Sequence, residues 1–529
     1  MSEAEACSLS PEEKVARTET LLTITSLSAD GTDGLPPPPI LTPEEEKRLW
    51  RKIDMRLIPI MTLLYLVSYI DRGNIGNAKL QGLLTQLDLN GQRYNIALTM
   101  FYLFYCIFNI PANLVLKKFR PSRWIPGMAL AWGIAATLTG LVKNYPQLVG
   151  VRICLGAAES GLSPGIYYML SMWYPRHMLQ WRFGLFWGGA TFSGAFSGLL
   201  SYGISFMSGT AGLLGWSWIF IIEGLVTIAA ALLAFAGTSV HPDMPTYILT
   251  RSRRRVLRQV FVDLPDTATF LTPEERSFVI NRLKEDNSSV GEEERFEFRH
   301  LTEAIFDWKI IVGSITNISI VSPIYAAALF LPSIINGFGF DPALSQLLTV
   351  PPYVVATVNV VLCSLYSDRI KMRSPFVLAG LVLTFIGFAV NVSDACIGAK
   401  YLGVHFVVIG AYLSAPIVIS WLGNNTVGHY KRGIGIGMQV MVGNFGGLVA
   451  SNVYHVQDAP RYIHGHIAEL VLVGTGLVLV PLTAFVYSRG NNMRDAAQRE
   501  AQARGMEVEY TVEQLKRMGD RAPDFRYTL

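Results

Sequence analysis

The sequence has little charge for its size. Of its 529 residues, 16% are Asp, Glu, Lys or Arg and 51% are hydrophobic, whereas an ordinary soluble domain carries about 25% charged residues. A soluble protein of this length needs far more charged surface. The net charge of +4 is also too small to indicate nucleic-acid binding. Composition therefore excludes a cytosolic enzyme and a disordered protein, and it leaves two arrangements for the apolar residues: one large core or many membrane spans.

Several signals of chemistry are also missing. The cysteines are scattered without metal or redox spacing, at Cys7, Cys106, Cys154, Cys363 and Cys396. No Walker A pattern, histidine cluster or nucleophile–base arrangement is present. We therefore expect a protein that is not an enzyme and that uses no cofactor and no metal. The first residues lack the basic stretch and apolar core of a signal peptide, so we expect a cytoplasmic N-terminal tail.

Long apolar runs are what the sequence has instead. A transmembrane helix needs about 20 mostly apolar residues. Twelve runs qualify, at roughly 57–77, 94–116, 124–142, 146–171, 183–207, 216–237, 308–335, 343–366, 374–392, 402–423, 433–453 and 466–487. They are continuous and rich in Gly, Ala and Leu, which favours helices over the alternating segments of a transmembrane barrel. The predicted fold is an all-α membrane protein with twelve transmembrane helices in two six-helix halves.

The spacing of the runs sets the domain boundaries. We predict a cytoplasmic tail with a short charged surface helix over 1–56, an N-terminal half over 57–237, a cytoplasmic central loop over 238–307, a C-terminal half over 308–488 and a cytoplasmic tail over 489–529. Basic turns follow the second run of each half, at 116–123 and 367–375. Two halves with equivalent turns are typical of transporters built from repeats, whose substrate site lies at the midplane.

Lys and Arg in the short loops predict the orientation. One set of loops holds Lys117, Lys118, Arg120, Arg123, Arg176, Arg182, Arg369, Lys371, Arg373, Lys431 and Arg432, and the opposite set holds only Lys79, Arg93, Lys143, Lys400 and Arg461. The richer set belongs in the cytoplasm. An even number of spans then places both termini inside, in a multi-pass protein that we expect in the plasma membrane.

Four ionisable residues lie inside predicted spans of the first half, where charge is costly and calls for a reason. Asp71 and Arg72 are adjacent in span 1, and Arg152 and Glu159 share one face of span 4. The arginines are able to hold an organic anion through paired hydrogen bonds, and the carboxylates are able to take up protons for coupling. The alternative is that Asp71–Arg152 or Arg72–Glu159 are neutralising pairs that only fix helix packing.

In the spans of the second half we expect the polar residues to be neutral. They are Asn317, Tyr325, Asn424, Asn425, Gln439 and Asn444. Gln439 and Asn444, in the glycine-rich span 11, and Tyr105, in span 2, are candidate substrate contacts or, equally, helix-packing residues. Asp368 and Arg369 are candidates for a cytoplasmic gate, with turn chemistry at a helix end as the alternative.

Two further residues have simpler interpretations. Glu223 of span 6 is expected to be a structural partner for an arginine of a cytoplasmic loop. Asn391 begins an Asn-Val-Ser glycosylation pattern at an outer edge.

A series of motifs resembles one family. Lys-Ile-Asp-Met-Arg-Leu-Ile-Pro at 52–59 precedes Tyr-Ile-Asp-Arg-Gly-Asn-Ile-Gly-Asn-Ala at 69–78, and Trp-Ser-Trp-Ile-Phe-Ile-Ile-Glu-Gly follows at 216–224. Leu-Leu-Thr-Val-Pro-Pro-Tyr at 347–353 and Gly-Asn-Phe-Gly-Gly at 443–447 continue the series. In this order the motifs resemble the anion:cation symporter family of the major facilitator superfamily, in its fungal allantoate-permease-like branch, over roughly residues 45–490.

The resemblance implies alternating access and proton-linked transport of small carboxylates or vitamin-like anions. It assigns substrate binding to Arg72 and Arg152 and proton coupling to Asp71 and Glu159. Span 5 departs from the family pattern, because Phe-Trp-Gly-Gly-Ala stands at 186–190 in place of a Tyr-Ser-Ala-like patch. The expected partners are a small organic anion, protons and the lipid bilayer, without nucleic acid, for a monomer. Two alternatives stay open: an exporter of a secondary metabolite or toxin on the same fold, and a transporter-like nutrient sensor.

Overall fold

The computed structural model describes residues 36–119, 121–238, 265, 268, 270–288, 298–427, 429–504, 520, 522–523 and 525–529. Helices dominate these residues, and no strand occurs among them. Residues 1–35, most of the interval 239–297 and residues 505–519 lie outside the described part. The predictions for the first 35 residues and for the arginines of the central loop fall there.

Helices occupy all six predicted spans of the first half. They are α2 (Pro43–Ala78), continued by the π-helical turn η1 (Lys79–Leu83) and α3 (Leu84–Gln86); α4 (Arg93–Lys118); α5 (Pro121–Thr139); α6 (Tyr145–Glu159) with α7 (Leu162–Trp173); α8 (Arg176–Ser205); and α9 (Gly215–Thr238). Span 4 is therefore two helices. Pro164 has no N–H to donate to the carbonyl of Ser160, and Asn109 Nδ2 donates to that carbonyl instead, at 3.2 Å.

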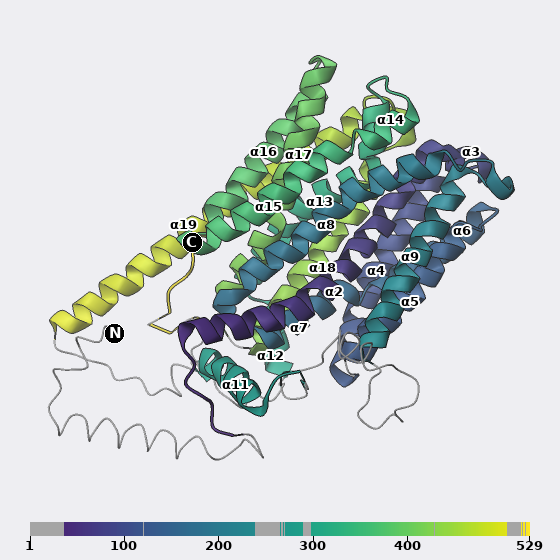
Figure 1. Cartoon of the computed structure of the whole chain (residues 1–529). Helices are drawn as coiled ribbons and strands as arrows, with labels where there is room; N and C mark the ends of the chain where they lie inside the picture. Colours follow the sequence, from purple (N-terminus) through teal and green to yellow (C-terminus); the bar gives the residue numbers. More distant parts are fainter. Residues whose placement is uncertain are drawn as a thin grey trace, which may run out of the picture.

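The second half repeats this arrangement. After α11 (Pro273–Ser288) and α12 (Phe298–Ile305), its helices are α13 (Trp308–Asn336), α14 (Pro342–Leu347) with α15 (Val350–Ile370), α16 (Ser374–Val392), α17 (Ile397–Asn424), α18 (His429–Val453) and α19 (Ile463–Ala503). Figure 1 shows these helices running side by side along one common direction. The start of α2 lies with α11 and α12 at one end of the bundle, and α3 and α14 lie at the other. We call these ends the terminal side and the far side.

Local sequence explains where several helices begin. Thr42 and Glu45 form a reciprocal capping box at the start of α2, with Pro43 in the first turn. Asn144, Asp307 and Asp341 cap α6, α13 and α14 by accepting a backbone N–H with the side chain. These caps satisfy backbone donors that a helix start otherwise leaves free.

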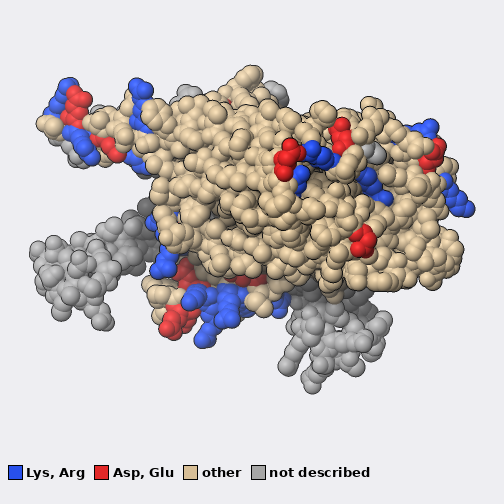
Figure 2. Space-filling model, turned by 90° about the horizontal axis from the view of Figure 1, so that it is seen from above, with Lys and Arg blue, Asp and Glu red and all other residues tan. Residues whose placement is uncertain are grey.

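The surface fits a lipid environment. Eight helical segments in the described residues are long and apolar enough to cross a membrane, and the remaining predicted spans are occupied by α4, α5, α6 with α7, and α8. Figure 2 shows a wide face in which few acidic or basic residues interrupt the other residue types. Large apolar side chains such as Leu232, Val471 and Val478 are exposed on the helices, as expected of residues that meet lipid.

Two predicted boundaries differ from the structure. The charged segment 44–56 is not a separate surface helix, because it forms the first turns of the continuous helix α2. Nothing between the segment and the span breaks the helix, and Pro59 is accommodated inside it. At the other end, α19 continues to Ala503, beyond the predicted limit of 488.

The predicted glycosylation pattern also meets a structural obstacle. Asn391 is buried, and its Nδ2 donates to the carbonyl of Gly387 at 2.8 Å inside α16. A side chain enclosed in a helix bundle does not offer an acceptor for a glycan.

The two halves meet closely on the far side. Asn95 Nδ2 of α4 donates to the carbonyls of Ser451 and Tyr454, at 2.7 and 3.0 Å. Gln346 Nε2 donates to the carbonyl of Asn77 at 3.3 Å. Gly76 lies so close to α13 that an added Cβ would stand 2.5 Å from the carbonyl oxygen of Leu329. The far side is therefore closed in this conformation.

Candidate transport site

The centre of the site is an ion pair between span 1 and span 4. Arg72 Nε of α2 lies 2.7 Å from Glu159 Oε1 of α6, and both side chains are almost completely buried. The Ser68 hydroxyl, one turn earlier on α2, donates to the same carboxylate oxygen. Of the two pairings that the sequence left open, the structure contains Arg72–Glu159.

Arg72 also contacts both halves of the molecule through tyrosine hydroxyls. Its Nη2 donates to Tyr105 of α4 at 3.2 Å, and its Nη1 donates to Tyr325 of α13 at 3.1 Å. The Tyr325 hydroxyl donates in turn to Asn444 Oδ1 of α18, at 2.6 Å. One guanidinium group thereby joins span 1 and span 2 to two helices of the opposite half.

Asp71 points away from Arg72. Its Oδ2 accepts from Trp132 Nε1 at 3.1 Å and lies 3.0 Å from the hydroxyl of Thr227 in α9. Its Oδ1 is buried and has no hydrogen-bond partner among the described residues. Asp71 forms no ion pair with Arg152 in this conformation, so the other pairing considered from the sequence is absent.

Arg152 is a buried cation with free donors. The side chain is 1% exposed, and its guanidinium carbon stands 5.4 Å from the centroid of the Phe220 ring. Its Nε and Nη2 find no hydrogen-bond partner in the described part of the chain. An unsatisfied buried guanidinium group is costly, and an incoming carboxylate would satisfy it with paired hydrogen bonds.

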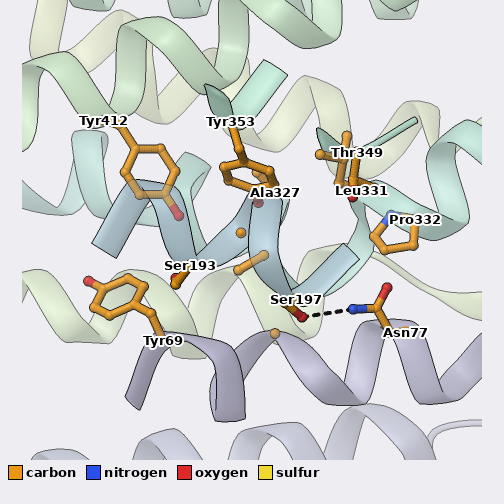
Figure 3. A pocket seen from close by; sticks show the side chains of 13 residues that line it. Tyr69, Asn77, Ser193, Ser197, Ala327, Leu331, Pro332, Thr349, Tyr353 and Tyr412 are labelled. Atoms are coloured by element: carbon orange, nitrogen blue, oxygen red, sulfur yellow. Dashed lines mark hydrogen bonds between the residues drawn. The ribbon is translucent and has the colours of Figure 1, made fainter. Parts of the chain in front are cut away.

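A small cavity lies between the halves; Tyr69, Gly73 and Asn77 of α2 line it, and the four charged residues do not. Figure 3 shows Tyr69 on one side of the cavity and Tyr353 and Tyr412 on the other, and Asn77 donates to Ser197 at its edge. The guanidinium carbon of Arg72 lies 4.8 Å from the centroid of the Tyr69 ring. The Tyr69 ring therefore contacts both the cavity and the buried cation.

The unusual segment of span 5 packs against this tyrosine. The Trp187 ring meets the rings of Tyr65 and Tyr69 edge-on, and its Nε1 donates to the Tyr167 hydroxyl at 2.9 Å. Gly189, two residues further on, lets α8 approach α2, because a Cβ there would stand 2.4 Å from Cγ2 of Thr62. Trp187 and Gly189 both pack α8 against α2 next to Tyr69.

Three other predicted residues lie apart from Arg72. The Gln439 side-chain amide donates to the backbone carbonyls of Gly313 and Val418, both at 3.3 Å, so it links α18 to α13 and α17. Asp368 pairs with Arg373 at 2.6 Å and also faces the backbone of Trp181 in α8. Arg369 is exposed. The gating role of Asp368 and Arg369 stays a prediction.

Comparison with known proteins identifies the family. The family model described as Major Facilitator Superfamily matches residues 61–451. The chain belongs to the major facilitator superfamily. It is 32% identical to the high-affinity nicotinic acid transporter of Saccharomyces cerevisiae, over 94% of this chain and 86% of that protein. It is 31% identical to the MFS-type transporter cnsO of Penicillium expansum, over 91% and 90%.

Solved structures of the superfamily share the fold. The proton:xylose symporter XylE, bound to 6-bromo-6-deoxy-D-glucose, aligns with a TM-score of 0.59 at 14% identity, over 81% of this chain and 95% of that chain. A bacterial homologue of the human lysosomal transporter Spinster, in an inward-facing, unoccupied conformation, aligns with a TM-score of 0.56 at 14% identity, over 84% and 97%. The twelve-helix fold of this major facilitator protein is thus shown independently of any functional likeness.

Sequence reasoning missed several residues of the buried polar network. Trp132, Thr227 and Ser68 carry no charge, and no pattern in the sequence marks them as partners of Asp71 and Glu159. Glu469 is different, because it is an ionisable residue within the predicted span 12 and the rule that selected Glu159 selects it too. The expectation that polar residues of the second half are neutral is therefore wrong, since Glu469 is fully buried in α19.

Glu223 also differs from expectation. It is buried in α9, and the carboxylate forms no ion pair with any described residue. It lies near Asp71, which raises the electrostatic cost of two charged carboxylates at this place.

Proposed function

We propose that this major facilitator protein is a proton-coupled secondary transporter of a small organic anion, a carboxylate or vitamin-like compound. The observation that supports this proposal best is the placement of Arg72. It is paired with a titratable carboxylate in its own half and with a hydroxyl group in the opposite half, and it contacts Tyr69, which lines a cavity between the halves. If this guanidinium group changes partner, the charge balance of the site, the binding of a substrate and the contact between the two halves all change with it.

Arg152 supplies the first contact for the substrate in this scheme. Its free N–H donors are buried beside Asp71 and Glu159, and a carboxylate ligand would neutralise it. Protonation of Glu159 would remove the charge that holds Arg72. The guanidinium group of Arg72 would then be free to bind the same substrate, which supports the predicted roles of both arginines.

Coupling follows from the cost of charge in a low-dielectric site. With substrate absent, the charge of Glu159 offsets that of Arg72. With an anion bound, a proton on Glu159 keeps the net charge of the site near zero. A site with little net charge favours the rearrangement of the two halves, because less charge has to be buried. Asp71 has one free carboxylate oxygen and no cationic partner, and we assign it a second proton.

The terminal side is cytoplasmic in this proposal, the membrane is the plasma membrane, and the transporter works as a monomer. The yeast relative with 32% identity is a nicotinic acid transporter, so nicotinate is the first probe among small carboxylates. Uptake and efflux of the same labelled compounds, in liposomes that contain the full chain, measure the preferred direction. A compound that shows efflux but no uptake would support the exporter alternative.

Glu159→Gln tests the coupling. We expect the variant to lose pH-gradient-driven accumulation of labelled nicotinate or another transported carboxylate, while exchange of substrate for substrate persists. Asp394→Asn, an exposed carboxylate paired with Arg461 on the far side, is the control and should accumulate substrate like the wild type. A Glu159→Gln protein that still concentrates its substrate against a gradient contradicts the coupling role.

A further inference from the structure

A second buried acid lies in the opposite half, outside the site described above. Glu469 of α19 is 0% exposed. Its Oε1 accepts a hydrogen bond from the Ser322 hydroxyl of α13 at 2.7 Å, and its Oε2 has no partner among the described residues. A carboxylate in this setting needs a cation or a proton to offset its charge.

No cation offsets the charge in the described structure. Glu469 forms no ion pair there, and the titratable groups around it are Tyr454, which follows the end of α18, and His466, one turn earlier on α19. Two neutral residues lie in this region: Ser322 of α13 contacts Glu469, and Asn391 of α16 lines a cavity together with His466 and Tyr454. Lys400 of α17 acts electrostatically on His466 and forms no ion pair with Glu469 among the described residues. A proton is therefore the ion that this site is built to hold.

The acid is linked to the far-side closure through Tyr454. The Tyr454 hydroxyl lies 3.1 Å from Nδ1 of His466, and its ring stacks on Phe330 at 4.8 Å between centroids. Its backbone carbonyl accepts from Asn95 of the opposite half. Opening of the far side must break this last bond, which would free Tyr454 and expose His466 and then Glu469 to water from that side.

The acid is also linked to the transport site, through α13. Ser322 and Tyr325 are three residues apart on this helix, so they lie about one turn from each other. Ser322 holds Glu469, and Tyr325 holds Arg72. A movement of α13 that accompanies loss of the proton from Glu469 would therefore reach the guanidinium group that pairs with Glu159.

We propose that Glu469 is a proton-exchange site of the C-terminal half: it holds a proton on Oε2 while the far side is closed and releases it, by way of His466, to far-side water when that side opens. The proton leaves as the O–H bond of the carboxyl group breaks, and it is returned from water before closure. The link from Glu469 to Arg72 rests on the proposed function, whereas the titration itself does not.

Infrared spectroscopy tests the titration without a substrate. The full chain in lipid vesicles is measured over a series of pH values. The wild type should show the carbonyl absorption of a protonated, buried carboxyl group that disappears as the pH rises. Glu469→Gln should remove one such component, and Ser322→Ala should shift its frequency because the hydrogen bond is lost. A Glu469→Gln spectrum identical to that of the wild type overturns the proposal.

Matched variants separate this site from the one at Glu159. Asp394→Asn removes an exposed carboxylate and should leave the buried component unchanged. If Glu469→Gln does not fold, Ser322→Ala still decides, because an unshifted band excludes Glu469 as its source. Glu159→Gln should retain the Glu469 component. If that variant still accumulates substrate, the coupling role of Glu159 fails while the infrared result for Glu469 stands.

Discussion

The two halves bring different kinds of polar side chain to the transport site. The N-terminal half holds Asp71, Arg72, Arg152 and Glu159 within its helices. The C-terminal half meets this group with a hydroxyl and an amide, from Tyr325 and Asn444. At the transport site the tasks are therefore divided: the N-terminal half carries the charges that bind and couple, and the C-terminal half contacts them through Tyr325 and Asn444, which do not change charge.

The halves are also held differently on the terminal side. In the N-terminal half, α2 is paired with α11 of the central interval, through Lys52–Glu275 at 2.6 Å. In the C-terminal half, the last residues of the chain return to the bundle. Thr528 exchanges hydrogen bonds with Asn425, and the Tyr527 ring stacks on Tyr487 at 4.6 Å. Each half therefore has its own attachment on this side.

The largest effect is expected at Arg152. Arg152→Gln removes the buried cation with free donors, and the loss of two charge-assisted hydrogen bonds should weaken binding of a transported carboxylate by about a hundredfold. Arg152→Lys keeps the charge without the forked geometry of a guanidinium group, so its affinity for the carboxylate should lie between those of the wild type and Arg152→Gln. Equilibrium binding to the purified protein measures both. Arg489→Gln, at an exposed position of α19, is the control. Equal binding by the wild type and Arg152→Gln would exclude Arg152 from the substrate site.

A smaller effect should distinguish the two tyrosines on Arg72. Tyr325→Phe and Tyr105→Phe each remove one hydroxyl from the same guanidinium group, but only Tyr325 belongs to the opposite half. A hydrogen bond to a charged group contributes about 1.5 kcal/mol, or roughly a tenfold change. We expect Tyr325→Phe to change the rate of substrate exchange more than substrate affinity, and Tyr105→Phe to show the reverse. If both variants change the exchange rate and the affinity in the same way, Tyr325 of the C-terminal half has no role different from that of Tyr105.

The sequence predicts the helices well because the membrane imposes a simple rule. A span must be long and apolar, and its backbone must satisfy its own hydrogen bonds, so continuous runs identify the helices. The same rule makes a buried charge conspicuous, which is why Asp71 and Glu159 are recognisable. The break in span 4 is less visible, since it depends on Pro164 and on a side chain, Asn109, from another helix.

The partners of the charged residues depend on tertiary packing. The sequence allowed Asp71–Arg152 and Arg72–Glu159 equally, and only the rotation of α2 against α6 decides between them. Gln439 and Asn444 are both amides on α18, yet backbone carbonyls engage the first and Tyr325 engages the second. Five residues separate them, so they project from different faces of the helix. The sequence alone does not say which face meets the opposite half.

A charged cluster anchors the end of the chain to the C-terminal half. Asp520 contacts Lys309, and it pairs with Lys431 at 3.2 Å. Asp307, which precedes α13, pairs with the same two lysines at 3.5 and 2.7 Å. Burial favours the neutral form of Asp307, but the hydrogen bond to Lys431 and the charge of Lys309 outweigh it and lower its pKa. Its contribution to stability is therefore present above the ordinary aspartate pKa and is lost as the pH falls through the lowered value.

The smallest expected effect, on stability and not on transport, is at this cluster. Asp520→Asn leaves the buried Lys309 with one carboxylate, Asp307, and with the carbonyl of Asn425. We expect a loss of about 1–2 kcal/mol in the free energy of unfolding at neutral pH. Thermal unfolding of the purified protein measures the loss. The difference between the variant and the wild type should shrink in strong acid, where both aspartates are protonated. Substrate exchange should stay close to that of the wild type, because the cluster lies within one half and does not join it to the other. A large loss of exchange without a loss of stability would instead make the end of the chain part of the transport cycle.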